Sequence, residues 1–260
     1  MEISIIILNY KSEQYLSRCI ESLQKSLTTV SYEILIINND SSLITSIFPT
    51  ENVRIIENRI NEGFAKACNQ AASTAKGNFL FFLNPDTEII TGNIMDLIVA
   101  MSDPFVGITA PHLITSSGKI QPWSTGYDIT LWDIVKNNFG IIKSKRLWGQ
   151  DSPVEVSWAS GAAFIIKKSL FNELLGFDEK FFMYFEDVDL CKRVLEKKLK
   201  IISLPSVQVL HIGGQSSSNS NQQKKYYYQS QDYYFKKHFG TFSLFFLKLL
   251  RMPTLWFNKN

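Results

Sequence analysis

Three acidic residues, Glu186, Asp187 and Asp189, directly follow the aromatic run Phe-Phe-Met-Tyr-Phe at residues 181–185. The apolar spacing beyond them predicts a helix, so the acids lie at a helix N-terminus. A carboxylate edged by apolar rings, and kept ionised by helix N–H groups, can act as a general base toward a sugar hydroxyl. Adjacent side chains diverge and cannot form the facing carboxylate pair of a glycosidase, which favours group transfer over hydrolysis. The same acids would also stabilise the helix dipole without any catalytic role.

Asp86 and His211 each lie at the end of an apolar run of strand length. A carboxylate there, in the sequence Asn84-Pro85-Asp86, suits an oxygen-preferring cation such as Mg²⁺ or Mn²⁺ that is itself held on a diphosphate. The imidazole of His211 can ligate the same cation. Both residues also have structural explanations, because Pro-Asp pairs are common in turns and a lone histidine is more often a satisfied structural residue.

Asn61, Gly63 and Asn69 flank the start of another predicted helix, where backbone N–H groups can approach a nucleotide closely. The first strand is followed by residues 9–16, which contain neither GxGxxG nor the GxxxxGK[ST] of a P-loop. Dinucleotide-dependent dehydrogenase and P-loop ATPase functions therefore lose their main support.

The elements that position these residues alternate in the first 110 residues between short apolar runs and helical patterns. Buried strands are predicted at residues 3–8, 33–37, 53–56 and 79–83. Apolar residues at helical spacing predict one helix over 16–23 and another after Gly63. This βαβ alternation predicts a mostly parallel sheet flanked by helices, in which ligands bind beyond the carboxyl ends of the strands.

The remainder of the chain is expected to be less regular. Residues 112–153 read as an insertion that contains Trp123, Trp132 and Trp148. The Gly- and Ser-rich residues 213–223 predict a flexible loop. Further elements are expected as a strand at 156–166, helices from 169 and over 187–198, and a strand at 200–211 interrupted by Pro205.

Charge is unevenly distributed along the 260 residues, whose formal net charge is only +3. Residues 224–260 contain seven Lys or Arg and one acid, Asp232, for a charge of +6, so the other residues carry −3. The same segment holds 12 of the 34 aromatic residues. The weak overall charge argues against a nucleic-acid partner, and the basic aromatic end is the feature to explain.

The cysteines and the chain ends suggest a reduced, intracellular protein. Cys19, Cys68 and Cys191 are far apart in the sequence, which favours free thiols in a cytosolic core over a zinc site or a disulfide framework. The apolar run at 3–8 is too short for a signal peptide, and residues 238–247 are about half the length of a membrane span.

Together these segments resemble the family 2 glycosyltransferases, an inverting class with the GT-A fold, and within it the rhamnosyltransferase-like branch. The resemblance covers nearly the whole chain, from Ile3 to about Gly240. Its order and spacing make it specific, and residues 176–190, GFDEKFFMYFEDVDL, are its most telling part. The other matching segments are residues 5–10, 33–41, 61–65 with Asn69, 82–87 and 158–162.

The resemblance implies a role for each matched position. Asp187 falls at the family's catalytic base and Asp86 at the last aspartate of its DxD motif. His211 falls at the histidine that often completes the Mg²⁺ or Mn²⁺ site or contacts the diphosphate. Asn38 and Asn84 replace aspartates of the family pattern, and Asp40 is the alternative to Asn38 as nucleotide contact. The expected donor-binding residues are Leu8, Asn9, Tyr10, Asn38, Asp40, Asn61, Gly63, Phe64, Asn69, Asn84, Pro85 and Asp86, and the expected acceptor-binding residues are Trp158, Gly161, Ala162 and Glu186.

The implied function is transfer of a sugar, expected to be L-rhamnose from dTDP-rhamnose, to a glycan or polyprenyl-diphosphate-linked acceptor in bacterial cell-surface polysaccharide synthesis. Galactofuranose, glucose and galactose remain open, as do a sugar nucleotidyltransferase and a non-catalytic nucleotide-sugar binding protein. Residues 1–223 are expected to form the GT-A domain, with a nucleotide-binding half up to about residue 111. Residues 224–260 are expected to form an amphipathic tail that either packs on the body or binds the cytoplasmic face of the inner membrane.

Overall fold

The computed structural model describes residues 1–28, 30–46, 48, 52–138, 140–213 and 220–257. Within these residues a nine-stranded sheet has the order β3-β2-β1-β4-β10-β6-β11-β5, with β8 paired to β11 at one side. Its strands are β1 (Ile3–Asn9), β2 (Tyr32–Asn38), β3 (Val53–Glu57), β4 (Phe79–Leu83), β5 (Thr87–Thr91), β6 (Val106–Ile114), β8 (Val154–Val156), β10 (Ala163–Lys167) and β11 (Lys200–His211). Short β7 (Thr125–Gly126) and β9 (Trp158–Ala159) form a separate pair.

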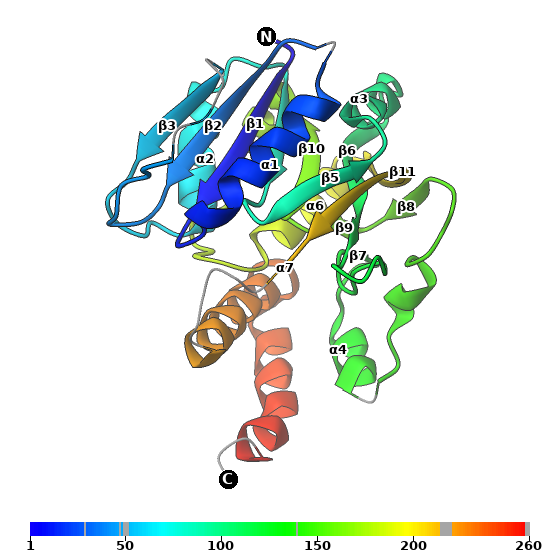
Figure 1. Cartoon of the computed structure of the whole chain (residues 1–260). Helices are drawn as coiled ribbons and strands as arrows, with labels where there is room; N and C mark the ends of the chain where they lie inside the picture. The colour runs from blue at the N-terminus through cyan, green and yellow to red at the C-terminus, as the bar shows by residue number, and fades with distance from the viewer. Residues whose placement is uncertain (29, 47, 49–51, 139, 214–219, 258–260) are drawn as a thin grey trace.

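Helices cover both faces of this sheet (Figure 1). They are α1 (Glu13–Ser26), α2 (Phe64–Thr74), α3 (Ile94–Val99), α4 (Leu131–Asn138), α5 (Lys168–Glu173), α6 (Glu186–Glu196) and α7 (Ser220–Phe257), with 3₁₀ turns η1 (Ala100–Ser102) and η2 (Lys143–Arg146). The predicted α/β architecture with flanking helices is confirmed. The pairs among β1 to β4 are parallel, whereas β10 runs antiparallel to both β4 and β6.

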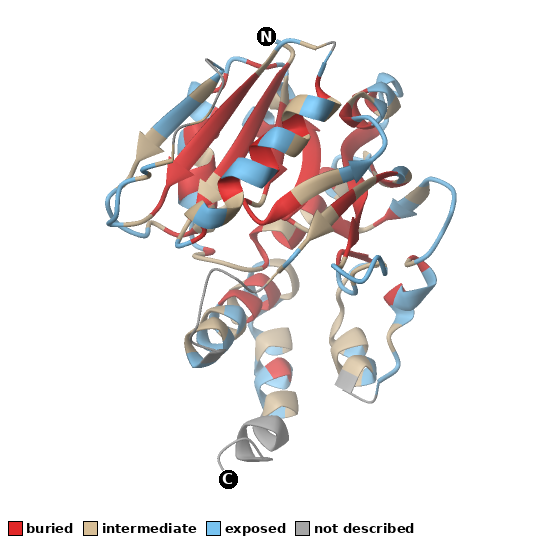
Figure 2. Cartoon of the chain, in the orientation of Figure 1, coloured by how far each residue is buried: buried red, intermediate tan, exposed pale blue. Residues whose placement is uncertain are grey.

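Burial follows the hydrophobic pattern of the sequence. The central strands are buried on both faces (Figure 2), because one core lies between the sheet and α2, α6 and α7, and the other lies beneath α1 and α3. Helix α1 buries Leu16, Cys19, Ile20 and Leu23, the stripe that its spacing predicts. The three cysteines are free and buried, and burial raises the pKa of the Cys19 thiol to about 12.

The expected strand over 156–166 is divided by a turn. Strand β9 ends at Ala159 and β10 begins at Ala163, because residues 160–162 leave the sheet and approach α6. The backbone N–H of Gly161 donates to the Asp187 carboxylate at 2.7 Å, which ties this turn to the helix. The division places backbone donors beside the first acids of α6. The expected interruption at Pro205 is not a break, because β11 is one strand from Lys200 to His211 whose register with β6 shifts between Leu204 and Gln208.

Helix α7 bends sharply at Gly240, whose φ of 83° is readily adopted only by glycine. Before the bend, Tyr234 and Phe235 are fully buried in the core, and Tyr234 lies against Phe185 with ring centroids 5.3 Å apart. After the bend, only Leu247 among the described side chains is fully buried, and the helix extends from the body (Figure 1). Within the described residues, no helix is both long enough and apolar enough to cross a bilayer.

The predicted loop at 213–223 is only partly described. Residues 214–219 lie outside the described residues, and they make up most of the predicted loop. Residues 220–223 already belong to α7. Of this helix, Gln222, Gln223 and Tyr226 line the main cavity, so the tail helix itself forms part of the site.

Candidate active site

A cavity of about 450 Å³ opens beyond the carboxyl ends of β1 and β4 and beside the start of α6. Segments far apart in the sequence meet there because the parallel strands end at one edge of the sheet. The candidate residues that line it are Leu8, Tyr10, Asn61, Gly63, Phe64, Asn84, Pro85, Asp86, Gly161, Ala162, Glu186, Asp187 and His211.

Asp187 is the carboxylate best placed to accept a proton in this cavity. Its Oδ2 accepts the N–H of Gly161 at 2.7 Å, and its Oδ1 accepts the N–H of Val188 at 2.8 Å. Burial raises the pKa of Asp187, and these two N–H groups offset only part of the rise. A fixed carboxylate with a raised pKa accepts a proton more readily than an exposed aspartate does.

The turn before α6 is strained. Tyr184 and Phe185 have consecutive positive φ values of 71° and 67°, a conformation that side-chain-bearing residues rarely adopt. Such residues cost about 1–3 kcal/mol each and persist where the surroundings hold them. The buried Phe185 ring and the bond from Ser230 Oγ to the Met183 carbonyl, at 2.8 Å, hold this turn against α7. These contacts with α7 therefore keep the acids of α6 at the cavity despite the strain.

Glu186 lines the same cavity but is held differently. Its side chain is 5% exposed, and Oε2 is buried without a hydrogen-bond partner. Burial raises the pKa of Glu186 well above its ordinary value, and the charge of Asp187 raises it further. The raised pKa favours the protonated form of Glu186, and a protonated carboxyl has an O–H group that can donate to a ligand.

Asp86 and His211 form the second polar group of the cavity. Asp86 Oδ1 lies 3.5 Å from His211 Nε2, and Asp86 Oδ2 accepts the N–H of Gly213 at 2.9 Å. Burial favours a higher pKa for Asp86, but His211 and the Gly213 N–H outweigh it, so the pKa of Asp86 is lowered. The Gln121 side chain, 3.0 Å from His211 Nδ1, orients the ring. Asp86 is therefore a fixed, ionised carboxylate.

This pair fits a divalent cation that is shared with a diphosphate. One carboxylate oxygen and one imidazole nitrogen lie close enough together to contact a single ion, and the Asn84 amide lies 3.3 Å from the same imidazole. Within the described residues, no group of three or more His, Cys, Asp or Glu could hold a metal ion by itself. Two protein ligands suffice for Mg²⁺ or Mn²⁺ when substrate phosphates and waters supply the others.

The expected nucleotide side of the cavity is organised by Asn39, which the sequence prediction passed over. Its Nδ2 donates to Asn61 Oδ1 at 3.0 Å and to the Gly63 carbonyl at 3.3 Å, while its Oδ1 accepts the Glu62 N–H at 3.1 Å. Gly63 has a φ of 85°, and a Cβ there would meet the Phe182 carbonyl at 2.6 Å. Asn39 and Gly63 thus shape the loop that leads into α2.

Two of the expected donor-binding residues, Asn9 and Asn38, instead bond other residues at the ends of β1 and β2. Asn9 donates to Asn38 Oδ1 at 2.9 Å, linking the ends of β1 and β2. Asn38 in turn donates to Glu57 Oε2 at 2.7 Å and to the Ser42 carbonyl. Neither residue lines the cavity.

Three other candidates also lie away from the cavity. The Asp40 carboxylate accepts the adjacent Ser41 N–H at 2.8 Å. Asn69 bonds the backbone of Phe177 in both directions, each at 2.9 Å, and so fastens α2 to the segment before α6. The Trp158 indole donates to the Tyr127 carbonyl at 3.0 Å and is buried. The structure thus gives these residues supporting contacts, while their expected roles toward ligands remain predictions.

Several lining residues were not singled out from the sequence. Most are sequence neighbours of the motif residues. Phe182, Met183 and Tyr184 belong to the aromatic run at 181–185, whose composition does not show that it lines the cavity. The helix α7 contribution had no signal beyond its aromatic content, and Tyr226 stacks near Phe182 with centroids 4.6 Å apart. The added lining residues are Lys11, Asn39, Ser160, Phe182, Met183, Tyr184, Gln222, Gln223 and Tyr226.

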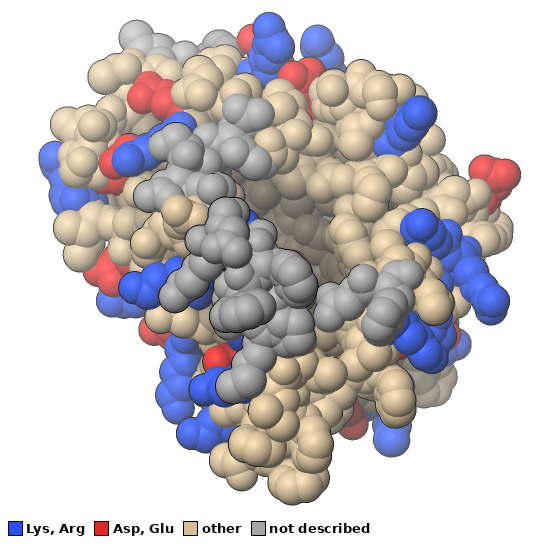
Figure 3. All heavy atoms as spheres, turned by 90° about the horizontal axis from the view of Figure 1, so that it is seen from below, with Lys and Arg blue, Asp and Glu red and all other residues tan. Residues whose placement is uncertain are grey.

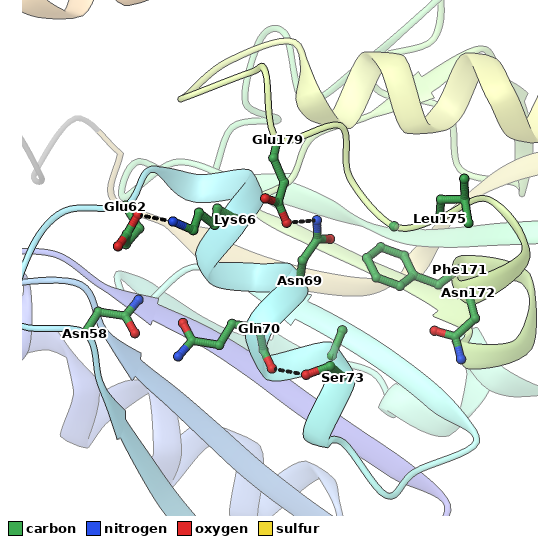
Figure 4. Close-up of a pocket in the computed structure, with 12 residues that line it drawn as sticks. Asn58, Glu62, Lys66, Asn69, Gln70, Ser73, Phe171, Asn172, Leu175 and Glu179 are labelled. Atoms are coloured by element: carbon green, nitrogen blue, oxygen red, sulfur yellow. Dashed lines mark hydrogen bonds and ion pairs between the residues drawn. The ribbon is translucent and has the colours of Figure 1, made fainter.

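A second, more open groove of about 620 Å³ lies along the outer side of α2 (Figure 4). Its polar groups largely bond one another: Lys66 pairs with Glu62 at 2.6 Å, and Asn69 donates to Glu179 at 3.0 Å. The groove contains Asn69 but neither Asp187 nor Asp86, so the candidate chemistry belongs to the smaller cavity.

The fold is that of nucleotide-sugar glycosyltransferases of known structure. GalNAc-T7, crystallised with UDP, GalNAc and Mn²⁺, superposes with a TM-score of 0.60 at 17% identity over 90% of this chain. S. aureus TarS 1–349 with UDP-GlcNAc gives a TM-score of 0.54 at 18% identity over 90%. The chain spans 50% and 65% of these two structures, respectively.

Residues 4–189 match Glycosyl transferase family 2, and the chain belongs to this family. The N-acetylglucosaminyl-diphospho-decaprenol L-rhamnosyltransferase of Mycobacterium tuberculosis is 26% identical over 80% of this chain and 75% of its own length. Rhamnosyltransferase WbbL of Escherichia coli K12 is 25% identical over 80% and 82%. The low-salt glycan biosynthesis hexosyltransferase Agl10 of Haloferax volcanii is 25% identical over 81% and 67%. The predicted family and the glycosyltransferase class are confirmed.

Proposed function

We propose that this glycosyltransferase transfers L-rhamnose, with inversion, from dTDP-L-rhamnose to a hydroxyl of a lipid-linked glycan in cell-surface polysaccharide synthesis. Two relatives described as rhamnosyltransferases support the sugar, and the decaprenol-linked substrate named for one of them supports the acceptor class. The hexosyltransferase Agl10 supports a six-carbon sugar without specifying it. Galactofuranose, glucose and galactose are therefore the comparison donors.

The observation that carries the proposal is the placement of two carboxylates with oppositely shifted pKa values in one cavity. Asp187 is a fixed proton acceptor of raised pKa, whereas Asp86 is ionised beside His211. A base for the acceptor hydroxyl and a ligand set for a diphosphate-bound cation are the two requirements of metal-assisted transfer. A protein that only bound nucleotide sugars would not need a base for an acceptor hydroxyl.

In this mechanism, a hydroxyl of the acceptor enters beside Asp187, which accepts its proton as the oxygen attacks the anomeric carbon. The bond to the nucleoside diphosphate breaks on the opposite side of that carbon, so one displacement inverts the configuration. Asp86 and His211 would hold a Mg²⁺ or Mn²⁺ ion, which when bound neutralises charge on the leaving diphosphate. The aromatic wall of Phe182 and Tyr226 restricts water in the cavity.

The proposal is tested with the purified full chain and a panel of nucleotide sugars. Nucleoside diphosphate release is measured with a lipid-linked acceptor in Mg²⁺, Mn²⁺ or chelator, and product stereochemistry is read by NMR. We expect acceptor-dependent release to be greatest with dTDP-L-rhamnose. Preference for another sugar would replace the rhamnose assignment, release of pyrophosphate would indicate a nucleotidyltransferase, and saturable donor binding without any product would indicate a binding protein.

Glu186 is proposed to donate a hydrogen bond to the acceptor through its protonated carboxyl. We expect Glu186→Gln, which keeps a donor group, to hold kcat/KM for the acceptor within a few-fold of wild type. Glu186→Ala should lower it about tenfold, the usual effect of losing one hydrogen bond. Steady-state kinetics with donor and acceptor varied separately provide the measurement. Equal losses in both variants would show that the donor function is not what matters.

We further propose that the chain associates with the cytoplasmic face of the membrane through the second half of α7. Phe242 and Phe245 on this segment are 75% and 58% exposed, and Phe246 and Leu249 are also exposed. Exposed aromatic rings with nearby cations are typical of segments that lie in a membrane interface. The membrane is also where a polyprenyl-linked acceptor would be found.

The Phe242→Ser/Phe245→Ser double variant should bind anionic vesicles about tenfold more weakly, because two interfacial rings are removed. Donor turnover with a water-soluble acceptor should be unchanged. Deletion of residues 241–260 should weaken vesicle binding as well, but it also removes the buried Leu247 and the contact between Arg251 and Asp232. Vesicle flotation measures the binding, and unchanged flotation of the point variant would contradict the assignment.

A further inference from the structure

The insertion between β7 and β8 contains a second apolar surface that the proposed chemistry does not use. Trp132, on α4, is 71% exposed, and Ile141, just beyond this helix, is 63% exposed. The opposite side of α4 is anchored, because Leu131 and Ile134 pack on the main core. The exposed Trp132 and Ile141 therefore belong to a segment that is held in place.

This segment lies beside the second half of α7. Helices α4 and α7 are in contact, and Leu244 of α7 packs against the same core cluster as Ile134. Both helices extend from the end of the molecule at which β1 and β4 finish (Figure 1). The apolar side chains of Trp132, Ile141, Phe242 and Phe245 are therefore presented at one end, which is also the end where the cavity lies.

The charges around Trp132 and Ile141 are almost all positive. Residues 131–146 contain four basic residues and one acid, a formal charge of +3. The acid, Asp133, is occupied by the backbone N–H of Thr130 at 3.0 Å and by its hydroxyl. The basic residues Lys136, Lys143, Lys145 and Arg146 are all exposed. Figure 3 looks onto this end of the molecule and shows basic side chains around much of its rim, with a hollow between them.

From this arrangement we propose that the α4–η2 segment, residues 131–138 and 140–146, is a second membrane-contacting element that inserts Trp132 and Ile141 into an anionic bilayer surface. Exposed aromatic and aliphatic side chains flanked by lysines match the acyl boundary and the anionic head groups of such a surface. The excess of exposed basic side chains beside the apolar ones favours an anionic lipid surface over a folded protein partner. With α7, it would contact the bilayer on two sides and turn the cavity toward a lipid-linked acceptor. The orientation of the cavity toward a lipid-linked acceptor rests on the proposed function, whereas the contact of residues 131–138 and 140–146 with the bilayer does not.

The test compares full-length wild type with the Trp132→Ser/Ile141→Ser variant by flotation with vesicles of phosphatidylcholine alone or with 30% phosphatidylglycerol, a composition chosen as roughly that of an anionic membrane surface. We expect the variant to bind the anionic vesicles about tenfold more weakly, and the Phe242→Ser/Phe245→Ser background to show a further loss. The matched control is Phe105→Ser. Phe105 is 62% exposed but precedes β6, at the opposite end of the sheet, so this variant should bind like wild type.

A second readout locates the indole directly. Lipids brominated near the head of the acyl chain should quench part of the tryptophan emission of wild type, and Trp132→Phe should lose that quenched part. Equal flotation of the Ser variant and wild type, or quenching unchanged in Trp132→Phe, would overturn the proposal. So would self-association of wild type that is lost in the Ser variant while vesicle binding is unchanged. Turnover with a water-soluble acceptor is measured in parallel, so a failed glycosyltransferase assignment would be distinguished from a failed membrane contact.

Discussion

Replacing Asp187 by asparagine is expected to lower the rate of sugar transfer by about 10²-fold or more while leaving donor affinity intact. The amide keeps the shape of the side chain but cannot accept the proton of the acceptor hydroxyl. Asp187 accepts the Gly161 N–H on one oxygen and the Val188 N–H on the other, and the single amide oxygen of asparagine can keep only one of these two bonds. Single-turnover rates and calorimetric donor binding measure the two effects separately.

The pH profile provides an independent check on the same residue. Burial raises the pKa of Asp187, so the acidic limb of kcat should lie at higher pH than for an ordinary aspartate, with activity falling as the base becomes protonated. Asp187→Asn should abolish this limb. Asp128→Asn is the matched control, because that carboxylate is exposed outside the cavity, where it pairs with Lys192 and accepts the Ile129 N–H. Near-normal turnover of Asp187→Asn would remove Asp187 from the role of base.

Replacing Asp86 by alanine is expected to abolish metal-dependent donor binding. The substitution removes the carboxylate whose Oδ1 lies 3.5 Å from His211 Nε2. A single imidazole supplies too few hard ligands for Mg²⁺ on a diphosphate. Calorimetry of nucleotide-sugar binding, with Mn²⁺ and with chelator, measures the loss.

Asp86→Asn separates charge from shape in this experiment. The asparagine carbonyl can still accept the Gly213 N–H, which Asp86 Oδ2 accepts at 2.9 Å, so the end of β11 should keep its position. We expect donor affinity in Mn²⁺ to fall for both substitutions and affinity in chelator to change little. If Asp86→Ala bound donor equally well with and without chelator, and as tightly as wild type, Asp86 would not be a metal ligand.

Much of the candidate site could be predicted because it depends on local patterns. The apolar runs that end at Asn9 and Leu83 are strands in the structure, and parallel strands bring their carboxyl ends together at one edge. The acids at 186–189 begin a helix, as their position after the aromatic run indicated. These features require only the periodicity of a few neighbouring residues.

The choice between adjacent residues was not predictable in the same way. Asn38 and Asn39 have the same side chain, and successive side chains of a strand point to opposite faces. Asn38 bonds Asn9 on the neighbouring strand, whereas Asn39 lines the cavity and holds Asn61. Asn69 similarly depends on Phe177, 108 residues away, for its hydrogen bonds.

The basic aromatic segment at residues 224–260 also separates what the sequence determined from what the tertiary structure decided. Its composition alone established an amphipathic segment with a charge of +6 that had to pack on the body or meet another surface. Tertiary structure decided that it does the first with Tyr234 and Phe235, which are buried, and leaves Phe242 and Phe245 exposed. The physical reason is the bend at Gly240, which directs residues of the same chemical type into different surroundings. Residue type sets how strongly a side chain avoids water, but only the folded chain determines which side chains have a surface to pack against.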